Sequence, residues 1–352
     1  MLFRKRDHLV GLDIGSSFIK VAELKPSKKG NILTKFGTAK VPVGAIVEGR
    51  VVDMEGVANT IRALFKSQKI KEKNVAISTG GHSVVIKTIN TGKVPEKELQ
   101  VAIYSEAEQY IPYDIDDVNI DFQIIGESEF SLDQMNVLLV AVKKDLVAEY
   151  IDLIAMAGLT AQIIDVDTFA LQNIYESLAG SDIEEVTLLV DVGASKTSLN
   201  ILKGSTSLMM RDNVSGTNQI IEELSAKLDI SIEEADKLYQ DRGKEQKNAK
   251  ILGEISKSVA STWCAEICEV VYAFQSSTNE NTVEKIVLSG GGGFVDGFLD
   301  SLRSELDVDV IPINPFEGLI LDKNRFPASF ISEVSLQAPI ALGLALRRMD
   351  DK

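Results

Sequence analysis

The sequence predicts an α/β protein built from two related halves, with a small α+β unit inserted into the first half. A segment at residues 10–17 recurs at residues 188–195, and each copy opens a series of strands and helices. The first series is interrupted between residues 84 and 158 by a segment with a pattern of its own. The chain of 352 residues is long enough for two to three domains of about 100–200 residues each.

The first half opens with strands and one helix. Asp53 is a typical N-cap, and the helix predicted after it has an apolar face formed by Val57, Ile61, Leu64 and Phe65. The expected strands, each bounded by glycine or by a polar turn, cover residues 9–13, 19–24, 32–41 and 74–78.

The inserted segment has the composition of a compact α+β unit. Pro112 stops its first helix, and Gly158 provides a C-cap for its second helix. In chain order we expect a strand, a helix, two strands and a helix, at residues 84–89, 95–109, 118–125, 135–142 and 144–157. The pattern of the first half then resumes with a strand at residues 161–166, which is why the segment is interpreted as an insertion.

The second half repeats the strands and adds a helical region. Its expected strands cover residues 186–190, 197–202, 208–211 and 285–288, and its expected helices lie within residues 216–257 (with a polar loop near 243–248), 259–275 and 337–348. The chain is therefore divided into a first subdomain (1–83 with 159–180), the inserted subdomain (84–158), a second subdomain (181–211 with 285–352) and a helical subdomain (212–284).

The two copies of the repeat share a residue pattern that suits phosphate binding. In each, an apolar strand brings an aspartate to its end, and a glycine then lets the chain turn back. The small residues that follow leave backbone N–H groups open to an anion. The candidate phosphate-binding residues are Gly15, Ser16 and Ser17 in the first hairpin and Gly193, Ala194 and Ser195 in the second.

The aspartates of the two hairpins, Asp13 and Asp191, would repel a phosphate, so we expect a different role for them. Mg²⁺ prefers carboxylate oxygens, keeps several of its waters and neutralises phosphates. The sequence therefore predicts that both aspartates hold a hydrated Mg²⁺. A single Asp-x-Gly hairpin is equally well explained by turn geometry, but two matching copies favour a phosphate clamp over two unrelated turns.

A glycine run follows the predicted strand at residues 285–288. Glycines after a strand permit a ligand to approach the backbone closely, and a flexible hinge is the alternative. Because the run comes third, after two phosphate-binding hairpins, we expect it to contact the nucleoside. Its members are Gly290, Gly291, Gly292 and Gly293.

Charge and composition exclude several other classes of function. The formal net charge is −15 and is spread along the chain, which disfavours binding to nucleic acid. No stretch approaches the ~18–20 apolar residues that span a bilayer, and no signal peptide is recognised, so we expect a cytoplasmic protein. Cys264 and Cys268 share one helix face without further soft ligands nearby, which predicts core residues rather than a metal site.

In the order of its two Asp-x-Gly hairpins and its later glycine run, the sequence resembles the actin-like ATPases. The resemblance implies an actin-like fold of two RNase H-like halves that binds ATP with Mg²⁺. It also implies that Lys20, seven residues after Asp13, reaches the nucleotide phosphates. Asp167 stands where these proteins place an acid near the attacking water, although a simple helix N-cap is an equal alternative for it.

Within this superfamily the sequence is similar, over nearly its whole length, to the PilM family of type IV pilus assembly proteins. The segments at residues 106–113 and 117–122 resemble the signature of the inserted subdomain (1C, SHS2-type) that this family shares in position with FtsA. The resemblance implies that the protein binds the cytoplasmic N-terminal peptide of the membrane protein PilN, between the insert and the first subdomain. It further implies a place at the inner face of the inner membrane, a role in twitching motility, and contact with assembly ATPases or further copies of the chain.

Three departures from the wider superfamily bear on activity. Ala194 and Lys196 replace small or hydroxyl residues of the second hairpin, and Tyr239 stands where a lysine near the nucleoside is usual. The chain also ends soon after its last helix, without the amphipathic membrane helix of FtsA-like proteins, which favours the PilM family. We therefore expect weak hydrolysis at most and a nucleotide-dependent scaffold, with a small-molecule kinase or a filament-forming cytomotive protein as the alternatives.

Overall fold

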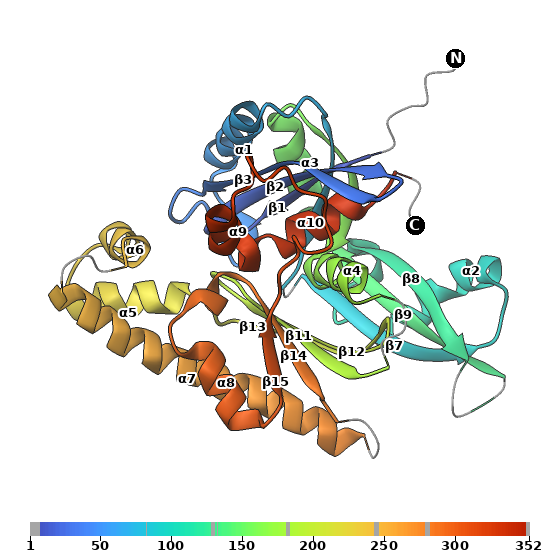
Figure 1. Cartoon of the computed structure of the whole chain (residues 1–352). Helices are drawn as coiled ribbons and strands as arrows, with labels where there is room; N and C mark the ends of the chain where they lie inside the picture. Colours follow the sequence, from blue (N-terminus) through green and yellow to red (C-terminus); the bar gives the residue numbers. More distant parts are fainter. Residues whose placement is uncertain are drawn as a thin grey trace.

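The computed structural model describes residues 8–81, 83–127, 131, 133–180, 184–242, 246–278 and 282–349. Within these residues the chain forms two five-stranded sheets, a three-stranded sheet and a small hairpin, with helices around and between them (Figure 1).

The first five-stranded sheet has the order β10-β6-β1-β2-β3. Strand β1 pairs antiparallel with β2 and parallel with β6, and β10 lies parallel to β6. The bounds of these strands are β1 Val10–Ile14, β2 Phe18–Ser27, β3 Gly30–Lys40, β6 Asn74–Thr79 and β10 Thr160–Val166.

The second five-stranded sheet, β13-β12-β11-β14-β15, repeats the order and directions of the first. In the equivalent hairpins Asp13 lies opposite Lys20, and Asp191 lies opposite Ser198. The predicted duplication is thereby confirmed at the level of strand pairing. The bounds are β11 Val186–Val192, β12 Thr197–Lys203, β13 Thr206–Asn213, β14 Lys285–Ser289 and β15 Asp309–Pro312.

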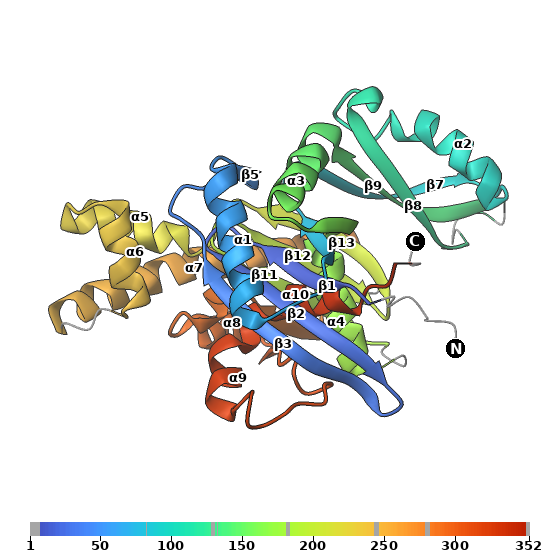
Figure 2. The ribbon, with the colours of Figure 1, turned by 90° about the horizontal axis from the view of Figure 1, so that it is seen from above.

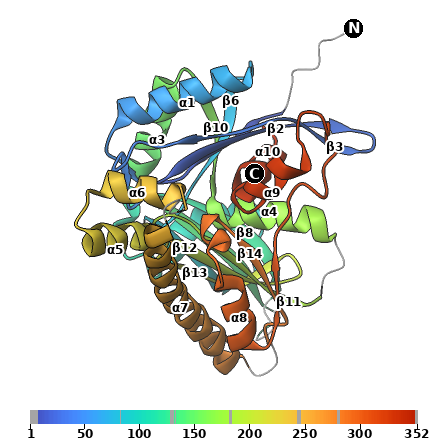
Figure 3. The same ribbon diagram turned by 60° about the vertical axis from the view of Figure 1, so that its left-hand side comes forward.

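The helices and the two sheets form alternating layers, which Figure 3 shows from the side. Helices α1 (Met54–Gln68) and α3 (Lys144–Met156) cover the outer face of the first sheet. The predicted cap is confirmed, because the Asp53 side chain accepts a hydrogen bond from the Gly56 N–H. Helices α5 (Asn218–Leu228), α7 (Gln246–Ser277) and α8 (Phe298–Leu306) cover the outer face of the second sheet, and α6 (Ile232–Gln240) packs on α5.

Helix α7 corrects the prediction for this region. It runs unbroken from Gln246 to Ser277, whereas the sequence predicted a loop up to residue 248 and a separate helix from 259. Packing explains the difference, since Ile255, Val259 and the fully buried Trp263 all lie in one core. Trp263 also stacks edge-on against Phe298 of α8, a helix that the sequence analysis did not predict.

Helices α4 (Asp167–Ala179) and α10 (Pro339–Leu346) lie between the two sheets, next to α9 (Ala328–Val334). Two glycines permit this close packing. A Cβ on Gly11 of β1 would collide with the carbonyl oxygen of Ala341, and one on Gly343 would collide with that of Ala170. Helix α10 is shorter than the predicted 337–348, because a 3₁₀ turn (Ser335–Gln337) precedes Pro339 at the first helical position.

The inserted unit has the predicted order of elements and projects from the two sheets (Figure 2). Its sheet, β7-β9-β8, and helix α2 enclose a core of their own. Helix α3 packs instead in the core of the first sheet, although the sequence analysis grouped it with the insert. The boundaries of the subdomains remain a prediction. The bounds are β7 Val84–Gly92, α2 Glu96–Ala107, a 3₁₀ turn at Ile115–Asp117, β8 Val118–Glu127 and β9 Gln134–Lys143.

The two cysteines and the most apolar helices were also the subject of predictions. Cys264 and Cys268 are buried free cysteines in α7, as predicted. In the described part of the chain no single helix is both long and apolar enough to cross a membrane. The pair Ala328–Gln337 and Pro339–Leu346 meets the length and composition criteria jointly, with a bend of 83° between its two parts.

Candidate functional site

A cavity of about 480 Å³ lies between the two halves, within the usual size range of ligand sites. Both predicted hairpins reach it, and so do Lys20, Asp167 and part of the glycine run. The predicted residues that line it are Asp13, Gly15, Ser16, Ser17, Lys20, Asp167, Asp191, Gly193, Ala194, Ser195, Gly290 and Gly291.

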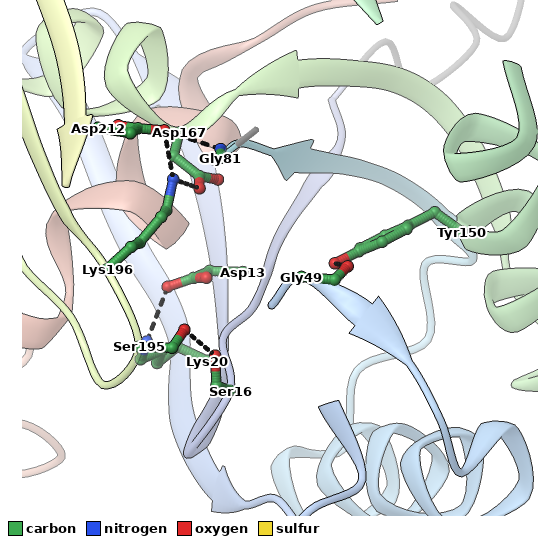
Figure 4. Close-up of polar contacts among 10 residues, drawn as sticks. All are labelled: Asp13, Ser16, Lys20, Gly49, Gly81, Tyr150, Asp167, Ser195, Lys196 and Asp212. Atoms are coloured by element: carbon green, nitrogen blue, oxygen red, sulfur yellow. Dashed lines mark hydrogen bonds and ion pairs between the residues drawn. The ribbon is translucent and has the colours of Figure 1, made fainter. Parts of the chain in front are cut away.

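The two hairpins have the same local structure. The Gly15 N–H donates to the Phe18 carbonyl at 3.1 Å, and the Gly193 N–H donates to the Lys196 carbonyl at 2.9 Å. The tips of the hairpins meet, because the hydroxyls of Ser16 and Ser195 lie 2.7 Å apart (Figure 4). The duplicated sequence thus produces two equivalent turns that face each other across one cavity.

Asp13 is the second-to-last residue of β1 and is buried, with the Lys20 ammonium 3.0 Å from one carboxylate oxygen. Burial raises the pKa of Asp13 and nearby Asp167 adds to this, although Lys20 acts in the opposite direction. The lysine predicted to reach phosphates is thus paired with the first hairpin's aspartate at the cavity wall.

Asp191 is the equivalent residue of the second hairpin and has no such lysine. The Ser289 hydroxyl donates to it at 2.7 Å. Burial raises the pKa of Asp191 to about 6, and the bond from Ser289 only partly opposes this. Two carboxylates with raised pKa values therefore face one cavity, and a cation between them would relieve the cost of their burial.

This arrangement fits the predicted Mg²⁺. Among the described residues no group of three or more histidine, cysteine, aspartate or glutamate side chains could hold a metal by itself. Mg²⁺ commonly binds through one or two carboxylates together with water and substrate phosphates. Asp13 and Asp191 are the residues that would hold it here.

Asp167 is the first residue of α4, and the N-cap alternative for it is wrong. The cap position belongs to Val166, and no side chain caps the helix. The Asp167 carboxylate lies 2.7 Å from the ammonium of Lys196, which is also 3.5 Å from Asp212. Asp212 in turn accepts a hydrogen bond from the Gly81 N–H at 2.7 Å (Figure 4).

Lys196 and Asp212 are site residues that sequence reasoning did not assign. Burial alone would raise the pKa of Asp167, but Lys196 outweighs burial and holds that pKa below its ordinary value. Burial likewise acts to lower the pKa of Lys196, and Asp167 followed by Asp212 raises it above its ordinary value. The one available signal was the presence of a lysine in a hairpin where a small or hydroxyl residue was expected.

The glycine run divides into two parts. Gly290 has φ 87°, and a Cβ there would collide with the Val192 backbone. Gly291 lines the cavity with more space, the nearest atom to a Cβ being the Gln337 side-chain nitrogen at 3.6 Å. The predicted nucleoside contacts of Gly292 and Gly293 are corrected: neither lines the cavity, because Gly292 packs on Val192 and Gly293 on Leu336.

The helical region forms the far wall of the cavity. Tyr239 of α6 and Leu252 and Gly253 of α7 line it, together with Arg242. Close to this wall Lys40, at the end of β3, forms an ion pair with Asp236 of α6. Asp236 is buried, so this pair joins the first sheet to the helical region beside the cavity.

A short hairpin of strands β4 (Ile46–Val47) and β5 (Arg50–Val51) forms another wall and was not predicted. Gly49 at its turn lines the cavity, and its carbonyl accepts a hydrogen bond from Tyr150 of α3 at 3.1 Å (Figure 4). Arg50 forms ion pairs with Asp145 and Glu149 of the same helix, each at 2.9 Å. The cavity wall is therefore fixed to the helix that directly follows β9 of the insert.

The family model described as type IV pilus assembly protein PilM matches residues 11–349. Among solved structures, a chain of the "PilM-PilN type IV pilus biogenesis complex" matches with 26% identity and a TM-score of 0.86, covering 97% of this chain and 98% of that one. The ethanolamine utilization protein EutJ from Carboxydothermus hydrogenoformans matches with 13% identity and a TM-score of 0.53, covering 96% of this chain and 89% of that one. With the repeated sheet topology, these matches confirm the predicted actin-like ATPase fold.

Proposed function

The chain belongs to the PilM family of type IV pilus assembly proteins, and we propose that it is an ATP-binding scaffold of that machinery. In this proposal it acts on the cytoplasmic side of the inner membrane and binds the N-terminal cytoplasmic peptide of a PilN-like membrane protein. Bound ATP sets the affinity for the peptide by favouring one arrangement of the two halves.

The observation that carries the nucleotide part is the pair of equivalent hairpins facing one cavity. Each offers a turn of small residues to a phosphate, and each brings one aspartate to the same space, Asp13 buried and Asp191 half-buried. Gly291 and Tyr239 lie farther along the walls, where a nucleoside would extend. This set suits Mg²⁺-ATP better than a phosphate-free ligand, because Mg²⁺ binds carboxylates together with phosphates, and Asp191 has no lysine at the position that Lys20 occupies beside Asp13.

The inserted sheet offers a surface for the peptide. Alternate residues of its strands face the core shared with α2, including Val137 and Leu139 of β9. The intervening residues face the other way; among them Ile86 of β7 pairs with Val140 of β9, and both are partly exposed. On this face the apolar pair Ile86 and Val140 lies next to Asp121 of β8, which is the other partner of Val140. The apolar pair and the unpaired edges of β7 and β8 within the sheet suit an extended peptide with apolar side chains.

Helix α3 provides a physical connection between the two sites. Tyr150, Asp145 and Glu149 hold the hairpin at the cavity wall, and the same helix begins where β9 of the insert ends. A shift of that hairpin on ATP binding would therefore move the base of the peptide surface. Among the described residues we find no comparable feature that favours the kinase or the filament alternative.

The test is a titration of a labelled PilN-like peptide, with and without Mg²⁺-ATP. We expect Ile86→Glu to abolish binding, because a charge would replace one of the two apolar side chains of this pair. Val101→Glu is the matched control, since Val101 lies on α2 and is 79% exposed. Equal binding by Ile86→Glu and the wild type would place the peptide elsewhere.

A second arm of the titration tests the coupling. Tyr150→Phe removes the hydrogen bond to Gly49 and should reduce the effect of ATP on peptide affinity while leaving affinity without ATP unchanged. An undiminished ATP effect would contradict the role of α3. Negative-stain microscopy with ATP tests the filament alternative directly.

A further inference from the structure

The Lys196 ammonium joins the two halves at the wall of the cavity. It extends from the second hairpin to Asp167 of α4, at 2.7 Å, and to Asp212 of β13, at 3.5 Å. Figure 4 shows the three charged groups together beside the turn at Gly81. Lys196 and Asp167 are both largely withdrawn from solvent, with 26% and 17% of their side chains exposed.

The pair is also held in place by its surroundings. A Cβ on Gly80 would collide with the Lys196 ammonium and would lie 2.6 Å from a carboxylate oxygen of Asp167. The two groups therefore pack directly on the backbone of residue 80, and a Cβ there would displace them. Asp13 has its own cation in Lys20, so Lys196 is not required to neutralise the first hairpin.

Hydrolysis of ATP releases a proton from the attacking water, and a nearby base accepts it. The water oxygen forms a bond to the γ-phosphorus, the bond to the β–γ bridging oxygen breaks, and ADP leaves with that electron pair. The water proton passes to a base, for which Asp167 is the candidate in this cavity. A carboxylate that already shares its charge with a lysine is a weaker base and is not free to turn toward water.

We propose that Lys196 restrains ATP hydrolysis by holding Asp167 in an ion pair, so that the site retains ATP for a long time. Lys196 is thus a positioning residue that acts through Asp167. The inference rests on the proposed function, since it presumes that the cavity binds Mg²⁺-ATP. It gives the weak hydrolysis expected for a scaffold a specific cause within this chain.

The experiment compares steady-state hydrolysis of Mg²⁺-ATP by the full-length wild type, Lys196→Met and Lys196→Arg. Lys196→Met keeps most of the length of the side chain and removes its charge; kcat should rise about tenfold or more, with KM little changed. Lys196→Arg keeps the charge, so its kcat should stay well below that of Lys196→Met. The double variant Lys196→Met with Asp167→Asn should lose the gain, because the released base is no longer present.

Several outcomes would overturn the inference. An unchanged or lower kcat in Lys196→Met would do so, as would a gain that persists in the double variant. A large rise in KM would instead make Lys196 a phosphate ligand. If thermal denaturation shows that Lys196→Met does not fold, Lys196→Gln replaces it with the same expected result. Calorimetry distinguishes failure of the proposed function from failure of this inference. A wild type that does not bind Mg²⁺-ATP contradicts the proposed function. Normal binding by the wild type, with an unchanged kcat in Lys196→Met, contradicts only the role of Lys196.

Discussion

The Ser16 hydroxyl lies 2.7 Å from the Ser195 hydroxyl, although 179 residues separate them in the chain. This hydrogen bond closes the cavity at the tips of its two hairpins. Bound phosphates that contact both turns would have to lie next to this bond or replace it. Phosphate binding between the two turns would therefore change the distance between the two halves of the protein.

The metal dependence of nucleotide binding tests the role of the hairpin aspartates. Asp13→Asn and Asp191→Asn should each weaken binding of Mg²⁺-ATP much more than binding of ATP in EDTA. Loss of an outer-shell partner already costs metal sites about 10- to 100-fold in affinity, so loss of a ligand should cost at least as much. Calorimetry measures both affinities. Wild-type Mg²⁺-ATP affinity in the two variants would contradict the clamp.

The raised pKa of Asp191 predicts a pH dependence of the same affinity. Because the carboxylate must be ionised to bind Mg²⁺, affinity for Mg²⁺-ATP should fall as pH decreases through about 6. Asp191→Asn should reduce this decrease, and the part that remains belongs to Asp13, whose pKa is also raised. A profile for the wild type that is flat between pH 7 and pH 5 would show that Asp191 does not contact the metal.

The same shift has the opposite effect on the nucleotide-free protein. The folded-state pKa of about 6 lies above the ordinary value of 3.8, so the folded state binds the proton more tightly than the unfolded state. The stabilising contribution of this group is fully present below pH about 4 and is lost as pH rises through about 6. Asp191→Asn should therefore raise the melting temperature at pH 7 without nucleotide, as measured by calorimetry. A lower melting temperature would mean that the ionised form is well compensated.

Two neighbouring glycines should respond differently to substitution. Gly290→Ala should destabilise the fold, because the added Cβ meets the Val192 backbone and φ is positive. Gly291→Val should leave the fold largely intact and weaken ATP binding, since its side chain would enter the cavity wall. Thermal denaturation and calorimetry together distinguish the two effects. A Gly291→Val protein with normal ATP affinity would remove this glycine from the nucleotide site.

The ion pair between Lys40 and Asp236 should slow the release of nucleotide. It joins the first sheet to the helical region, so it must break when the cavity opens on that side. Lys40→Met should accelerate ATP dissociation about fivefold, corresponding to the roughly 1 kcal/mol typical of a partly exposed pair. Stopped-flow release of a fluorescent ATP analogue measures this rate. Lys227→Met is the control, because Lys227 pairs with Glu254 away from the cavity wall.

The duplicated fold and both hairpins could be predicted because each depends on residues close together in sequence. Asp13 and Gly15 lie within one turn, and so do Asp191 and Gly193, so their spacing alone indicates the local structure. The first part of α7 could not be predicted in this way. Its polar residues resemble a loop, and burial of Ile255 and Val259 against the second sheet determines its structure.

The ion pairs of Lys196 with Asp167 and Asp212 could not be predicted from local sequence patterns. Lys196 and Asp167 meet only because α4 lies between the two sheets, and nothing in the spacing of 29 residues indicates contact. The glycine run shows the same limit. Glycines in sequence can serve close packing as well as ligand contact, and the backbone path determines that Gly291 faces the cavity while Gly292 faces Val192.

The position of α10 has a consequence for the order in which the chain folds. Leu9 and Ala22 of the first half share one core with Ala341 and Leu344. During translation β1 and β2 leave the ribosome long before residue 346 has been made. Until then, α10 does not cover their inner face. N-terminal units usually complete their folding during synthesis. Here the inner face of the first sheet is covered only after α10 has been made. A chain stalled on the ribosome within the second half would therefore expose apolar residues such as Leu9 and Ala22 to chaperones.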